Sequence, residues 1–142
     1  MAPPGENLRI NPDRLWDSIH ELAEIGPGIA GGSNRQTLTD DDAKGRALFQ
    51  NWCEGAGMSM SVDQMGTMFA TRLGADPDAL PVYVGSHLDT QPTGGRYDGV
   101  LGVLAGLEVV RGRRHVDGRR PDGDDVRHPS GHRSRCATGL CR

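Results

Sequence analysis

The chain has 142 residues, which allows one domain with a modest hydrophobic core. Its net charge of −3 gives no reason to expect nucleic acid as a partner, and no segment approaches the roughly 20 apolar residues that span a bilayer. The three cysteines are too widely spaced for a disulfide framework or a zinc module. We therefore predict a cytoplasmic protein that binds neither membrane nor nucleic acid.

Two helices are predicted in the first third of the chain. The first begins at Asn11-Pro12, where a side-chain cap precedes a proline in the first turn, and it ends at Gly26-Pro27. The second begins at Thr39, before three aspartates that the helix dipole favours, and Gly55 and Gly57 end it. The apolar face of this second helix is predicted to hold Ala43, Ala47, Leu48 and Trp52.

Three strands and a third helix are predicted in the middle of the chain. Alternating apolar and polar residues predict a strand over 58–63, and a second strand is predicted over 67–73, after a turn at Gly66. The apolar run 81–86 predicts a buried central strand. A helix over 99–111 follows a glycine-rich loop, and its small residues leave room for close packing on a sheet. The order of elements predicts an α/β fold with helices packed on a mixed sheet.

The sequence pattern changes at Gly112. Residues 112–142 contain eight of the fifteen arginines and three of the five histidines, and neither a helical nor a strand period continues there. Such a segment buries too little apolar surface to offset its conformational entropy, so we expect it to be disordered. The spacing of its histidines and cysteines matches no zinc module, and we interpret them as accidental composition.

The residues best suited to chemistry lie between 85 and 99. His87 follows the apolar run, at the end of a strand where open α/β sheets bind ligands. Asp89 lies two residues further on and can orient the His87 imidazole. Asp98 precedes the third helix, where it can act as a helix cap or as a metal ligand. From spacing alone, an ordinary surface pair and a helix cap remain the alternative interpretation.

The segment that begins Gly85-Ser86-His87-Leu88-Asp89 and continues to Arg111 resembles the signature of the hydantoinase/carbamoylase amidases. This family includes N-carbamoyl-L-amino-acid hydrolases, allantoate amidohydrolases and β-ureidopropionases of the metal-dependent aminoacylase–carboxypeptidase superfamily. The resemblance extends over about residues 8–111. It implies that residues 1–111 are the N-terminal part of a di-metal exopeptidase-like catalytic domain, truncated and followed by a tail, residues 112–142.

The resemblance also implies a role for each of the three site residues. His87 would bind one metal ion, Asp98 would bridge two metal ions, and Asp89 would be the catalytic residue that orients His87. Enzymes of the family use two divalent ions (Zn²⁺, Mn²⁺, Co²⁺ or Ni²⁺) to hydrolyse a C–N bond of a small carbamoyl or ureido substrate, with a glutamate as general base. They are homodimers, and the dimerisation domain would lie downstream of the segment that this chain resembles.

The resemblance stops at Arg111, where the family continues into a strand and a Glu-Glu pair. In this chain no glutamate follows Glu108, and we interpret the change as a reading-frame shift near codon 111. Three hypotheses remain open. The chain is by origin part of a metal-dependent amidohydrolase, or it is a non-catalytic remnant of one, or it is a small metal-binding or interaction protein.

Overall fold

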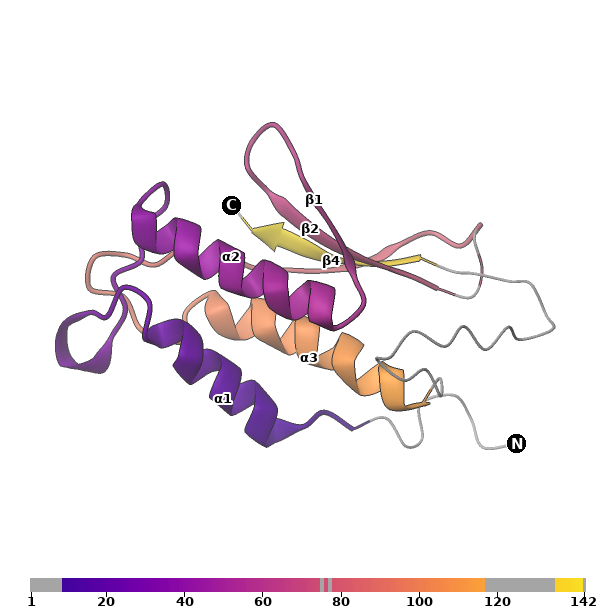
Figure 1. Cartoon of the computed structure of the whole chain (residues 1–142), viewed down its shortest axis with the longest axis horizontal. Coiled ribbons are helices and arrows are strands. Elements are labelled where there is room, and N and C mark those ends of the chain that lie inside the picture. The colour runs from indigo at the N-terminus through magenta and orange to yellow at the C-terminus, as the bar shows by residue number, and fades with distance from the viewer. Residues whose placement is uncertain (1–8, 75, 77, 117–134, 142) are drawn as a thin grey trace.

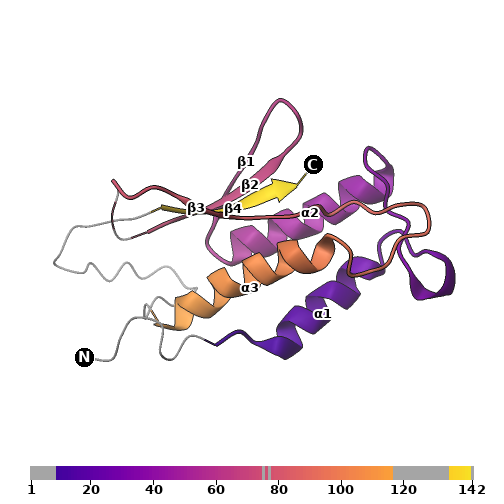
Figure 2. The same cartoon turned by 180° about the vertical axis from the view of Figure 1, so that it is seen from behind.

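A computed structural model describes residues 9–74, 76, 78–116 and 135–141, with the backbone alone for 113–116 and 135–141. The described elements are three α-helices, a short 3-10 helix (Ile29–Gly31) and a four-stranded mixed sheet (Figure 1). Seen from both sides, the three helices lie on the same side of the sheet (Figures 1 and 2). Within the described residues, no helix is both long enough and apolar enough to cross a bilayer.

The first two helices begin where their capping residues predict. Helix α1 spans Pro12–Ala23, and the Asn11 side chain accepts the backbone N–H of Arg14 at 3.0 Å. Helix α2 spans Asp40–Gly55, and the Thr39 hydroxyl accepts the backbone N–H of Asp42 at 3.2 Å. The two predicted N-termini are therefore confirmed.

The buried face of α2 agrees with the predicted one only in part, because Leu48 and Trp52 are half-buried and pack against the core as predicted, whereas the two predicted alanines do not. The residues of α2 that are buried are Asp42, Gly45, Phe49 and Cys53. Ala43 and Ala47 are exposed, because turning the larger Phe49 inward buries more apolar surface than turning two alanines inward. Asp42 is compatible with this face because its carboxylate accepts the backbone N–H of Leu38 at 3.0 Å.

The sheet has the strand order β1-β2-β4-β3. Strands β1 (Ser59–Val62) and β2 (Met68–Leu73) pair in antiparallel fashion and confirm the two predicted strands. Strand β4 (Arg135–Cys141) pairs antiparallel with β2 and parallel with β3 (Val82–Val84). Helix α3 therefore connects two neighbouring parallel strands.

The apolar run at residue 81 forms an edge strand, whereas the sequence predicted a buried central one. All three residues of β3 are exposed, Val82 by 65% and Val84 by 44%. The difference has a topological cause, because β4 separates β3 from β2 and β3 is the last strand of the described sheet. Burial of a strand depends on its neighbours, which its own sequence does not specify.

The prediction of disorder after Arg111 is wrong for two stretches. Helix α3 spans Val100–Val116, and residues 135–141 form β4. A strand is held by hydrogen bonds between backbone groups. These bonds can form without a periodic pattern of apolar side chains. The predicted disorder of residues 117–134 and 142 concerns positions outside the described residues.

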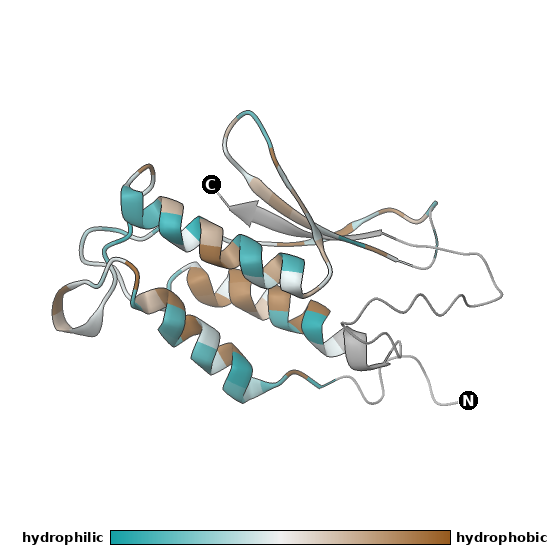
Figure 3. Cartoon of the chain, in the orientation of Figure 1, coloured by the Kyte–Doolittle hydropathy of each residue, from teal (hydrophilic) through white to brown (hydrophobic). Residues whose placement is uncertain are grey.

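Helix α3 lies at the centre of the hydrophobic core (Figure 3). It contacts β3, β4 and α1, while α2 contacts β1. Two glycines bring it close to β3 and to the segment that follows this strand, as predicted. A Cβ on Gly102 would lie 2.9 Å from the Ser86 Cβ, and one on Gly106 would lie 3.0 Å from a methyl carbon of Val84. The buried apolar residues of α3 are Val100, Val103, Leu104, Leu107 and Val110.

Candidate metal centre

The three predicted site residues lie on the connection between β3 and α3. This connection runs beside the one between α1 and α2, at one end of the molecule (Figures 1 and 2). Two backbone hydrogen bonds join the connections, from Thr90 N–H to the Arg35 carbonyl at 2.8 Å and from Ser33 N–H to the Gly94 carbonyl at 2.9 Å. The candidate site therefore lies where these two connections are hydrogen-bonded to each other.

His87 and Asp89 are in direct contact. The Nδ1 atom of His87 lies 3.0 Å from the Asp89 carbonyl oxygen and 3.3 Å from its carboxylate Oδ1. Both oxygens can only accept a hydrogen bond at neutral pH, so Nδ1 must carry the proton in this arrangement. The lone pair of a neutral imidazole is then on Nε2, the atom left to bind a metal ion.

His87 also lies against Gly99, the residue that follows Asp98. A Cβ built on Gly99 would be 2.3 Å from His87 Cε1, 2.4 Å from Nδ1 and 2.5 Å from Nε2. Gly99 has a φ of +72°, a conformation that other residues rarely adopt. The fold therefore brings the His87 imidazole next to the backbone that carries Asp98, although eleven positions separate the two residues.

The Asp98 carboxylate is exposed, and it makes no hydrogen bond to any described residue. The backbone carbonyl of Asp98 accepts the N–H of Val100 at 2.8 Å, which begins α3. The helix-cap alternative would require the carboxylate to accept such an N–H, as Asn11 does for α1. This geometry leaves the carboxylate oxygens of Asp98 available to a ligand.

The loop that carries Asp98 is anchored by its two preceding residues. The Tyr97 ring stacks on Trp16 of α1, with ring centroids 6.1 Å apart at 26°. The Arg96 guanidinium donates to the Gly31 carbonyl through Nε at 2.8 Å. These contacts between distant segments were not predicted, because no sequence period connects them.

Arg35 and Thr37 were also missed as residues of the site. Arg35 lies immediately after a glycine-rich connection, yet it is 1% exposed and its guanidinium donates to the Leu88 carbonyl. The Thr37 hydroxyl donates to Asp89 Oδ2 at 2.7 Å. Burial lowers the pKa of the Arg35 guanidinium from its ordinary value, and the charges of Asp42 and Asp89 act in the opposite direction.

The chemistry of the donors fits one part of a metal centre. Imidazole nitrogen and carboxylate oxygen are both ligands of Zn²⁺ and other first-row divalent ions. His87 and Asp98 supply one of each. Among the residues whose side chains are described, no group of three or more histidines, cysteines and acidic residues is arranged to hold a metal ion. A complete site would need further ligands.

The sequence is similar to curated N-carbamoyl-L-amino-acid amidohydrolases. One from Rhizobium meliloti is 75% identical over 111 residues, which are 78% of this chain and 27% of that protein. Another from Geobacillus stearothermophilus is 40% identical over 102 residues, 72% of this chain and 25% of that protein. The chain thus spans about a quarter of the length of these relatives. No family model matches the chain.

The structure is similar to part of a solved enzyme. A hydantoinase/carbamoylase family amidase from Burkholderia ambifaria superposes with a TM-score of 0.78 at 49% sequence identity. The match covers 93% of this chain and 30% of that one. The structural likeness therefore reaches further along the chain than the 78% of the sequence match.

Proposed function

Because the chain belongs to the hydantoinase/carbamoylase amidase family, we propose that it carries part of the active site of a metal-dependent hydrolase of N-carbamoyl-L-amino acids. The relatives are much longer, so the proposal concerns the contribution of these residues to such a site. Among the possible carbamoyl and ureido substrates, the 75% identity to the Rhizobium meliloti relative favours an N-carbamoyl-L-amino acid.

The observation that carries the proposal is the packing of His87 on Gly99. This packing places a histidine with a free Nε2 beside the loop of Asp98. The carboxylate of Asp98 makes no hydrogen bond to any described residue. A histidine and an aspartate that served only as a surface pair and a helix cap would not need this close approach. We assign metal binding to His87 and Asp98, and the orientation of His87 to Asp89.

Each residue has a distinct part in this proposal. Divalent metal ions, when bound, supply Lewis-acid activation of water and of the carbonyl group that is attacked. His87 offers a neutral nitrogen, Asp98 offers negative charge that offsets the charge of the cations, and Asp89 keeps the proton of His87 on Nδ1. The general base and the remaining ligands would come from outside the described residues.

A chimera tests the proposal. Residues 1–111 of this chain would replace the matching segment of the Rhizobium meliloti relative, and ammonia release from N-carbamoyl-L-amino acids would be measured with added Zn²⁺, Mn²⁺ or Co²⁺. We expect the chimera to be active. We expect His87→Ala and Asp98→Asn to lower kcat/KM by at least about a hundredfold. Losing a residue that only supports a metal ligand lowers activity by up to about a hundredfold, so losing the ligand itself should cost at least as much.

Two matched controls separate the site from general damage to the fold. His20→Ala removes the other described histidine whose Nδ1 lies close to a backbone carbonyl, and Asp17→Asn removes an exposed carboxylate on α1. Both variants should keep the activity of the chimera within about threefold. An inactive but folded chimera, or activity that survives Asp98→Asn, would contradict the proposal.

We also propose that the chain consists of two parts, residues 1–111 from the catalytic domain and residues 112–142 read in a shifted frame. The length of the sequence match and the arginine-rich composition after residue 111 support this division. Sequencing the coding DNA through codon 111 tests it. If another frame encodes an apolar strand and a Glu-Glu pair, the proposal holds; if no frame does, it fails.

A further inference from the structure

Arg35 is a buried arginine that is bound by backbone carbonyls instead of a carboxylate. Its Nη1 donates to the carbonyls of Leu22 and Ile25, both at 2.9 Å, at the end of α1. Its Nε and Nη2 donate to the carbonyl of Leu88 at 3.2 and 2.8 Å. Among the described residues, no carboxylate forms an ion pair with it.

Burying a guanidinium is costly, so its position must be supported by the surrounding structure. Helix α2 provides the space, because a Cβ on Gly45 would lie 2.7 Å from Arg35 Cδ. The three carbonyls come from α1 and from the segment that carries the site residues. Arg35 thereby ties the site segment to the end of α1.

The same segment is held at each residue from 88 to 90. Arg35 N–H donates to the Thr90 hydroxyl at 2.7 Å, and Thr90 N–H donates back to the Arg35 carbonyl at 2.8 Å. The Thr37 hydroxyl donates to Asp89 Oδ2 at 2.7 Å. These bonds fix the backbone on both sides of Asp89 and the direction of its carboxylate, which leaves Oδ1 facing His87.

We propose that Arg35 and Thr37 are positioning residues for His87. Arg35 fixes the peptide that joins Leu88 to Asp89 through the Leu88 carbonyl, and Thr37 fixes the Asp89 carboxylate. Together they keep two acceptor oxygens on Nδ1, so that the imidazole stays in the Nδ1–H tautomer with Nε2 free. The metal-binding purpose of this tautomer rests on the proposed function above, whereas the tautomer itself is measurable in the 142-residue chain.

The test is the tautomer of His87, read from ¹⁵N spectra of the imidazole in the full-length chain. Spectra would be recorded at roughly pH 8.5. His20 is an internal reference, because its Nδ1 lies 2.9 Å from the Trp16 carbonyl, away from Arg35 and Thr37. We expect both histidines of the unaltered chain to be in the Nδ1–H form.

Thr37→Val is the decisive variant, because Thr37 is exposed and its loss leaves the core intact. We expect it to lower the ratio of the Nδ1–H to the Nε2–H form of His87 roughly fivefold, the effect of losing about one net hydrogen bond. Thr37→Ser should restore the ratio. Arg35→Met should lower it further and increase amide exchange at Thr90, while the His20 ratio stays unchanged.

A purely structural role would give a different result. It would lower the melting temperature of Arg35→Met and leave the tautomer of His87 in the folded chain unaltered. An unchanged His87 ratio in Thr37→Val, or a mixed tautomer in the unaltered chain, would overturn the proposal. If the chimera is inactive but Thr37→Val still shifts the tautomer ratio of His87, the proposed function fails and the positioning role stands. The failures of the two proposals are therefore distinguishable.

Discussion

The imidazole of His87 occupies the space that a Cβ at position 99 would take, so a side chain at this position would have to displace it. A Cβ there would be 2.3 Å from His87 Cε1, well inside van der Waals contact. The contact involves backbone on one side and a candidate metal ligand on the other. Glycine at this position therefore serves both the turn into α3 and the approach of His87 to the loop of Asp98.

Gly99→Ala should displace His87 and destabilise the chain. The substitution adds the cost of a positive φ to that of overpacking, together about 2–4 kcal/mol in the free energy of unfolding. Urea unfolding followed by circular dichroism measures this cost, and His87 ring shifts report the displacement. Gly95→Ala is the matched control. A Cβ there meets nothing within 4 Å, so we expect a change within about 0.5 kcal/mol. Equal effects of both substitutions would contradict the explanation.

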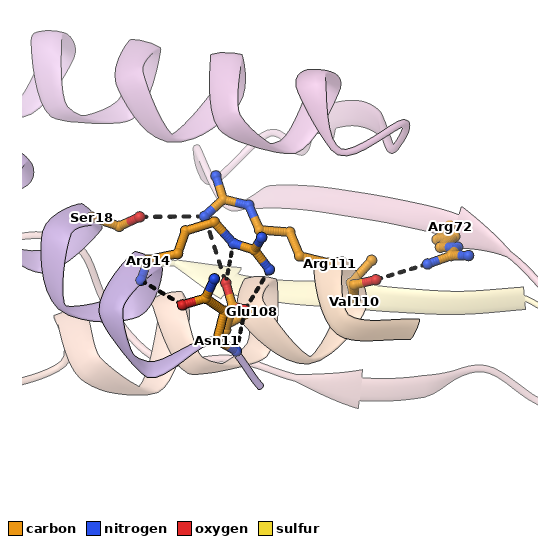
Figure 4. A network of polar contacts seen from close by, with 7 residues as sticks. All are labelled: Asn11, Arg14, Ser18, Arg72, Glu108, Val110 and Arg111. Carbon is orange, nitrogen blue, oxygen red and sulfur yellow. Dashed lines mark hydrogen bonds and ion pairs between the residues drawn. The ribbon is translucent and has the colours of Figure 1, made fainter. Parts of the chain in front are cut away.

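Glu108 joins the beginning of α1 to α3 through a buried carboxylate (Figure 4). Its side chain is 1% exposed and accepts hydrogen bonds from Arg14 Nε at 2.9 Å, from Arg14 Nη2 at 2.5 Å and from the Asn11 N–H at 2.9 Å. Arg111 Nη1 lies 3.9 Å away. The Glu108 carboxylate is therefore shielded from water, whereas water still reaches the Arg14 side chain, which is 37% exposed.

Glu108→Gln should lower the free energy of unfolding by about 2–3 kcal/mol, less than for a fully buried pair, because water can partly solvate Arg14. Lys44→Gln is the control, because the Lys44–Asp41 pair at 2.9 Å is exposed on both sides and water screens its attraction, so it contributes little to stability. Urea unfolding in 0.1 and 1 M salt measures how much each of the two substitutions lowers the free energy of unfolding. A loss for Glu108→Gln no larger than that for Lys44→Gln would show that the network contributes little.

The edge strand β3 should make the chain associate with itself. An exposed strand edge that carries apolar side chains is a template for pairing, and Val82 is 65% exposed. Sedimentation velocity over a range of concentrations should detect oligomers, and Val82→Lys should reduce them several-fold. Ala47→Lys places the same charge on the exposed face of α2 and should leave association unchanged. A strictly monomeric chain at all concentrations would refute this prediction.

The 142-residue chain alone should not hydrolyse N-carbamoyl amino acids. The residues assigned to metal binding are two, His87 and Asp98, whereas even one catalytic zinc ion usually has three protein ligands. No glutamate follows Glu108 to serve as the general base that the proposed function needs. Ammonia release with added Zn²⁺, Mn²⁺ or Co²⁺ should equal that of a metal-only blank. Turnover above the blank that His87→Ala abolishes would disprove the prediction.

Much of the local structure could be predicted from the sequence. Asn11 and Thr39 fix the beginnings of α1 and α2, because a cap acts within one helical turn. The small residues Gly102 and Gly106 indicated where α3 approaches a strand. His87, Asp89 and Asp98 stood out because they cluster within twelve residues. Each of these signals depends on neighbours in the chain.

Other features were decided by contacts between distant segments. The buried face of α2 depends on how the large side chain of Phe49 packs in the core. Strand β3 is an edge strand because β4 lies between it and β2. Arg35 contacts Leu88 across 53 positions, and no period in the sequence indicates such a contact. The sequence alone indicated which residues have side chains of a kind that binds metal ions, because this depends on the chemistry of each side chain. The tertiary structure decided which of them meet and what holds them, because burial and hydrogen-bond partners depend on how distant segments pack.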